Sequence, residues 1–207
     1  MKLLLATHNE HKRRELERML AGATGAVRWE LEVLPADVEL PPEDGETFAA
    51  NALGKARAAV AATGRVSIAD DSGICAAALG GAPGVRSARY AGEHASDTEN
   101  LEKLRREVPV DGALEYVCAI AYVQADGLER VFEGRCAGRM AAHARGDRGF
   151  GYDPTFLPDE YSSTNDGRPG PTMAELSDEQ KDLISHRGRA ARALLEWLES
   201  RPRPSAG

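Results

Sequence analysis

The chain has few cysteines, and their spacing matches neither a disulfide framework nor a metal-binding motif. Its 207 residues include three, Cys75, Cys118 and Cys136, which are far apart, odd in number and without a CxxC pair. This argues against a disulfide scaffold and against a structural zinc site. We predict three small buried side chains in a reducing compartment, and therefore a cytoplasmic protein.

Long apolar runs and an excess of positive charge are also missing. The longest apolar run after the first residues, 117–123, is too short to span a membrane, and polar residues from Thr7 onward interrupt the apolar start too early for a signal peptide. The net charge of −7 argues against binding to a nucleic-acid polymer, which needs a basic surface. We expect neither a membrane nor a nucleic-acid partner, although a few converging cations can still bind phosphates.

The length and the apolar content indicate one domain with a sizeable core. Apolar residues make up 42% of the chain, and segments typical of strands alternate with segments typical of helices. We predict a single α/β domain over residues 1–200, and a disordered tail over residues 201–207.

An unusual carboxylate pair follows the apolar run 66–69. The order Asp70-Asp71-Ser72-Gly73 predicts a strand that ends in a tight turn and leads into a helix. Two carboxylates at a strand end suggest a hard metal ion or an activated water, and the alternative is an ordinary surface turn. Because neighbouring strand residues point to opposite faces, we expect only one of the two aspartates to enter a cleft.

A strand over residues 2–6 leads directly into a helix that Asn9 is predicted to cap. The unpaired N–H groups of a helix start, together with Lys12, favour an anion, although most such turns bind nothing. The pattern places Glu15 among the charges of the solvent face, and Gly22 and Gly25 are predicted to end the helix.

The next segments predict an acidic loop, a long helix and a hairpin. The loop covers residues 35–45 and the helix residues 48–62, with Asn51 and Lys55 one turn apart on a stripe that faces either solvent or a cleft. Two strands, 115–124 and 128–137, are joined at Asp126-Gly127, which is typical of a tight hairpin turn.

Two further stretches carry candidate binding residues. Glycines flank Phe150, so its ring can stand free and stack on a planar base, whereas the alternative is a core phenylalanine in a glycine-rich turn. A single helix is predicted to begin at Ser177, to carry Lys181, His186 and Arg187, and to continue as an apolar stripe to Leu198.

Six motifs, in this order, resemble those of the inosine triphosphate pyrophosphatase family over residues 4–198. They are A-T-x-N-x-x-K at 6–12, T-F-x-x-N-A at 47–52, I-A-D-D-S-G at 68–73, G-G-A-P-G-x-x-S-A-R-Y at 80–90, G-F-G-Y-D-P at 149–154, and A-E-L, K and I-S-H-R within 174–187. The resemblance implies an α/β fold with a long mixed sheet flanked by helices and two lobes around a central cleft, usually as a homodimer. It implies Mg²⁺-dependent hydrolysis of ITP, dITP and XTP to the monophosphate and pyrophosphate.

The resemblance also assigns roles to individual residues. Asp71 would be the catalytic proton acceptor and a metal ligand, with Glu43 as the second metal carboxylate and Glu46 as its alternative, and Ser72 would contact the substrate. The other implied substrate-binding residues are Thr7, His8, Asn9, Glu10, His11, Lys12, Phe150, Gly151, Tyr152, Asp153, Lys181, His186 and Arg187.

The chemistry of purines suggests how the base is chosen. Hypoxanthine and xanthine present an acceptor at O6 where adenine presents an amine, so donors from His186 or Arg187 would favour the former. The sequence offers no group that explains the rejection of guanine. Two other functions stay open: a nucleotide sensor without turnover, which the presence of Asp71 and Lys12 disfavours, and a hydrolase of modified pyrimidine or methylated nucleotides.

Overall fold

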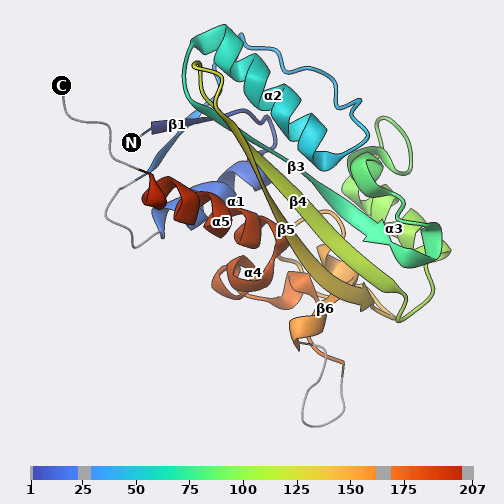
Figure 1. The fold of residues 1–207 in the computed structure, drawn as a ribbon. Coiled ribbons are helices and arrows are strands. Elements are labelled where there is room, and N and C mark those ends of the chain that lie inside the picture. The colour runs from blue at the N-terminus through green and yellow to red at the C-terminus, as the bar shows by residue number, and fades with distance from the viewer. Residues whose placement is uncertain (1, 23–28, 162–168, 202–207) are drawn as a thin grey trace.

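The residues that the structure describes form one six-stranded mixed sheet with helices on both faces (Figure 1). The computed structural model describes residues 2–22, 29–161 and 169–201, so the predicted tail, apart from Arg201, and Gly25 lie outside the described residues. The strand order is β2-β1-β3-β4-β5-β6; β1 runs parallel to β2 and β3, and the remaining neighbours are antiparallel. The strands are β1 Lys2–Leu5, β2 Glu30–Val33, β3 Ser67–Ala76, β4 Ala113–Val123, β5 Glu129–Met140 and β6 Phe156–Pro158.

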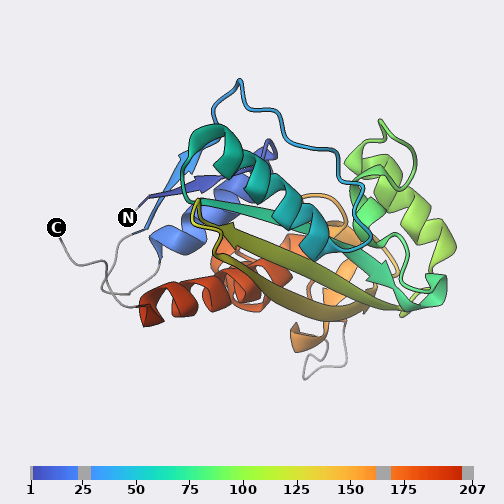
Figure 2. The same cartoon turned by 45° about the horizontal axis from the view of Figure 1, so that its top comes forward.

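Five α-helices in the described part of the chain cover this sheet. They are α1 Glu10–Ala21, α2 Phe48–Thr63, α3 Asp97–Glu107, α4 Asp178–Ile184 and α5 His186–Ser200. Helix α2 packs on one face, mainly through alanines, whereas α1 and α5 pack their leucines on the other, and α3 closes one end of the sheet (Figure 2). None of the helices in the described ranges is long and apolar enough to cross a membrane. The predicted α/β class and mixed sheet are confirmed.

The prediction of a strand end and a turn at Asp70-Asp71-Ser72-Gly73 is wrong. Strand β3 continues to Ala76, because all ten of its residues pair with β4. Gly73 allows this close packing, since a Cβ there would collide with Ser87 and the carbonyl of Gly84. Strand β1, however, stops at Leu5 beside Ile68, so the aspartates still lie next to the turn that leaves β1.

The single helix predicted from Ser177 onward is two helices. Ser185 has extended backbone angles, so α4 ends there and α5 begins, and its hydroxyl accepts a hydrogen bond from the N–H of Gly188 at 3.0 Å. The predicted start at Ser177 is confirmed, and Ser177 and Gln180 form a capping box there. The break changes the direction of the chain between Lys181 and His186, and both side chains reach one pocket.

Candidate active site

A pocket of about 760 Å³ collects the predicted site residues from distant parts of the chain. Its lining comes from the turn after β1, the acidic loop, Lys55 of α2, residues 85–97 and the segment around Phe150. All the predicted residues line it: Thr7, His8, Asn9, Glu10, His11, Lys12, Glu43, Asp71, Ser72, Phe150, Gly151, Tyr152, Asp153, Lys181, His186 and Arg187. Glu46, the alternative to Glu43, is exposed and does not line it.

The turn from Thr7 to Lys12 is held by its own hydrogen bonds. The side chain of Asn9 accepts from the N–H groups of His11 at 3.0 Å and of Lys12 at 3.1 Å, which confirms the predicted cap. Thr7 accepts from the N–H of Asn9 at 3.2 Å. Since Asn9 already occupies two N–H groups of the helix start, an anion here would depend on Lys12 and the dipole of α1 more than on those amides.

The two adjacent aspartates have different surroundings, as their alternation along the strand predicts. Asp70 is fully buried and does not line the pocket; its Oδ2 lies 3.3 Å from Nζ of Lys12 and 3.0 Å from Nη2 of Arg187. Burial alone would raise the pKa of Asp70, but Lys12, Arg187 and Lys55 together hold it well below its usual range. Asp71 points into the pocket, so it is the aspartate available for chemistry.

Helix α2 supports Asp71 from the side opposite to α1. Asn51 donates from Nδ2 to Oδ2 of Asp71 at 2.9 Å, and the N–H of Ser72 donates to Oδ1 at 2.9 Å. Lys55 pairs with Glu43 and donates to the carbonyl of Asp70 at 2.6 Å. The stripe of Asn51 and Lys55 therefore faces the cleft, which decides between the two alternatives left by the sequence.

Asp71 and Glu43 both line the pocket, and their charges interact, so they could hold a cation together. Burial raises the pKa of Asp71, and the charge of Glu43 adds to this, whereas Lys55 and Lys12 oppose it. Within the described ranges, no group of three or more His, Cys, Asp or Glu side chains is arranged to bind a metal. A metal held here would need water and substrate oxygens to complete its shell, which is how Mg²⁺ usually binds.

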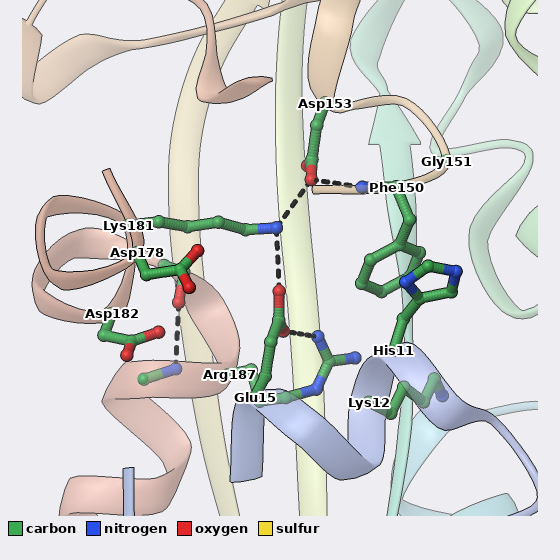
Figure 3. Close-up of polar contacts among 12 residues, drawn as sticks. His11, Lys12, Glu15, Phe150, Gly151, Asp153, Asp178, Lys181, Asp182 and Arg187 are labelled. Atoms are coloured by element: carbon green, nitrogen blue, oxygen red, sulfur yellow. Dashed lines mark hydrogen bonds and ion pairs between the residues drawn. The ribbon is translucent and has the colours of Figure 1, made fainter. Parts of the chain in front are cut away.

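A buried network of alternating charges lies beside the pocket (Figure 3). Glu15 of α1 is 6% exposed; its Oε1 lies 2.8 Å from Nζ of Lys181, and its Oε2 lies 2.6 Å from Nη1 of Arg187. Lys181 also reaches Oδ2 of Asp153 at 2.6 Å. The prediction that Glu15 faces solvent is therefore wrong, because two cations from α4 and α5 draw it inward. Its spacing of three residues from Lys12 places both on one helix face, and this was the available signal.

The network fixes the protonation state of its members. Burial would raise the pKa of Glu15, but Arg187 and Lys181 lower it to about 2. Burial would likewise lower the pKa of Lys181, but Asp153 and Glu15 raise it. The cations are thus fully charged and already paired before any ligand binds.

Phe150 is presented by a loop that Asp153 holds in place. Oδ2 of Asp153 accepts a hydrogen bond from the N–H of Phe150 at 3.0 Å. Gly149 has a φ of +72°, and a Cβ at this position would collide with the same carboxylate. The ring of Phe150 stacks on His11 with centroids 5.0 Å apart and planes 18° apart. The ring is only partly buried and lines the pocket, so the alternative of a core phenylalanine is wrong.

A family model, curated relatives and solved structures all match this chain over nearly its whole length. A model of the Ham1 family matches residues 3–197. Proteins named dITP/XTP pyrophosphatase from Mycolicibacterium paratuberculosis and Corynebacterium glutamicum are 48% and 49% identical, over 96% of this chain and 96% and 97% of theirs. A solved HAM1 protein from Coxiella burnetii superposes with a TM-score of 0.81 at 34% identity, covering 97% of this chain and 100% of its own.

Proposed function

The chain belongs to the Ham1 family, and from this membership we propose that it hydrolyses ITP, dITP and XTP to the monophosphate and pyrophosphate. The observation that carries the proposal is a single pocket that gathers Asp71, Lys12 and Phe150, one group for each part of such a substrate. Relatives named dITP/XTP pyrophosphatase, which match this chain over nearly their whole length, support it.

The triphosphate would lie between the start of α1 and the acidic loop. Lys12 and the positive end of the helix dipole would stabilise the negative charge that develops on the leaving pyrophosphate. Asp71, with its raised pKa, would accept a proton from the water that attacks the α-phosphorus in line. Asn51 and the N–H of Ser72 would keep the carboxylate oriented for that step.

We also propose that Asp71 and Glu43 hold Mg²⁺ with the substrate. A bound Mg²⁺ would neutralise phosphate charge. The residues fit this role because both carboxylates line the pocket and Glu43 raises the pKa of Asp71, which indicates that their charges interact. Lys55 would keep Glu43 beside the site.

The purine would stack on Phe150, with its O6 edge towards His186 and Arg187. The guanidinium of Arg187 uses four of its five N–H groups on Asp70, Glu15 and Ser72. His186 has more hydrogen-bonding capacity left than Arg187, so we assign the main contact with the base to His186. A donor left unpaired by adenine would cost about 1–3 kcal/mol.

The substrate proposal is tested by pyrophosphate release from ITP, dITP, XTP, GTP, ATP and dUTP, with and without Mg²⁺. We expect rapid release from the first three only, and only with Mg²⁺. Equal rates on GTP and ITP would refute the proposal, fast turnover of dUTP would favour the pyrimidine alternative, and binding without release would favour a sensor.

Glu43→Gln is expected to raise the Mg²⁺ concentration for half-maximal rate by roughly 10–100-fold, the range seen when support for a metal site is lost. The reason is that the neutral amide removes one of two anionic ligands. Glu46→Gln, an equal change at an exposed position three residues later, is the control and should leave this concentration unchanged. If Glu46→Gln shifted the Mg²⁺ dependence and Glu43→Gln did not, the ligand assignment would be reversed.

A homodimer in the cytoplasm is part of the same proposal. The dimer follows from the family resemblance, and the location from the three unpaired cysteines at positions 75, 118 and 136, which fit a reducing compartment. Light scattering of the purified chain tests the first, and localisation of a tagged chain the second.

A further inference from the structure

Tyr116 of β4 lies at the meeting point of two segments that would hold the base. It is 6% exposed and lines the pocket. Its ring stacks on His186 with centroids 4.6 Å apart and planes 7° apart, and packs on Phe156 with centroids 4.5 Å apart. A near-parallel stack on a buried ring leaves His186 little freedom to tilt.

The hydroxyl of Tyr116 reaches the second segment. It donates to Oδ1 of Asp153 at 3.1 Å, while Oδ2 of the same carboxylate accepts from the N–H of Phe150 at 3.0 Å and from Lys181 at 2.6 Å. One side chain from the centre of the sheet thus contacts His186 at the start of α5 and, through Asp153, the loop that presents Phe150.

His186 itself is incompletely satisfied. It is 6% exposed, and its Nδ1 is buried without a hydrogen-bond partner among the described residues. Burial holds the pKa of His186 well below its usual value, so the ring is neutral and can meet the edge of a neutral base. An unpaired buried nitrogen costs free energy, and a site that tolerates this cost is a candidate for function.

We propose that Tyr116 is a positioning residue that fixes the gap between His186 and Phe150, and thereby sets the preference for the non-standard purine. This rests on the proposed function. A fixed gap favours the base that contacts His186 and Phe150 at the same time. If the gap loosens, that base loses more binding free energy than the ordinary purines, which fit less well from the start.

The test compares Tyr116→Phe, which removes only the hydroxyl, with Tyr116→Leu, which also removes the stack. Tyr122→Phe is the matched control, since this hydroxyl of the same strand contacts Gln124 and Arg201 away from the pocket. For Tyr116→Phe we expect KM for ITP to rise about tenfold with kcat within twofold, the change that about 1.4 kcal/mol produces. In Tyr116→Phe the ratio of kcat/KM for ITP to kcat/KM for GTP or ATP should fall. It should fall further in Tyr116→Leu, whereas Tyr122→Phe should leave it unchanged.

The outcomes separate the inference from the function on which it depends. If the unaltered chain releases no pyrophosphate from ITP, the proposed function is refuted. If it does, and Tyr116→Phe keeps its KM and its selectivity within twofold, the positioning role is refuted. An equal loss on all three nucleotides through kcat, with a lowered melting temperature, would also refute it, because a purely structural role predicts that pattern.

Discussion

Asp71→Asn is expected to lower kcat for ITP by about three orders of magnitude while the nucleotide still binds. Loss of a general base alone costs about 10²–10⁴-fold, and here the same carboxylate is proposed to hold the metal. The amide is nearly isosteric and Asn51 and Ser72 remain beside it, so the pocket should keep its shape. The variant therefore removes charge and basicity, and little else.

Pyrophosphate release gives the rate, and isothermal titration with ITP and Ca²⁺, in place of Mg²⁺, gives the affinity. Asp111→Asn is the control, because Asp111 is exposed and its positive φ of 59° is one that asparagine tolerates. Full turnover in Asp71→Asn would remove Asp71 from the mechanism. Weakened binding with an unchanged kcat at saturating ITP would make it a residue for affinity only.

The sequence was sufficient to predict that the side chains of the two aspartates point to different faces, although the predicted end of their strand was wrong. Alternation along a strand predicts opposite faces for Asp70 and Asp71 wherever the strand ends. The apparent turn came from Ser72 and Gly73, which are ordinary turn residues. Pairing with β4 and the close approach of Ser87 to Gly73 override that local preference, and neither can be read from the segment itself.

The caps and the motifs were predictable because their signals are local. Asn9 caps α1 as the sequence indicates, since a cap needs only a side chain and the next three residues. The burial of Glu15 was not predictable in this way, because it depends on cations more than 160 residues later in the chain. Charges on a helix are usually solvated, so the spacing of Glu15 from Lys12 indicates a shared helix face, whereas the burial itself depends on Lys181 and Arg187.

Glu15→Gln is expected to lower the free energy of unfolding by about 3–5 kcal/mol near neutral pH, the cost of breaking a buried ion pair. The substitution leaves Lys181 with Asp153 and Arg187 with Asp70, so two buried cations lose a shared anion. Urea unfolding measures the change. Glu17→Gln, on the same helix but in a partly exposed pair with Arg13, should cost at most about 0.5 kcal/mol.

The pH dependence distinguishes a lost charge from a lost shape. The pKa of Glu15 falls from its usual 4.5 to about 2 on folding, so the stability it contributes is present above pH 4.5 and is lost as the pH drops towards 2. At 1.36 kcal/mol per pH unit this is about 3 kcal/mol. The gap between the unaltered chain and Glu15→Gln should therefore narrow across that window, while acid destabilisation through Asp70, whose pKa is also lowered, continues in both. A gap that stayed constant from pH 6 to 3 would assign the loss to packing, and the charge network would then contribute little to stability.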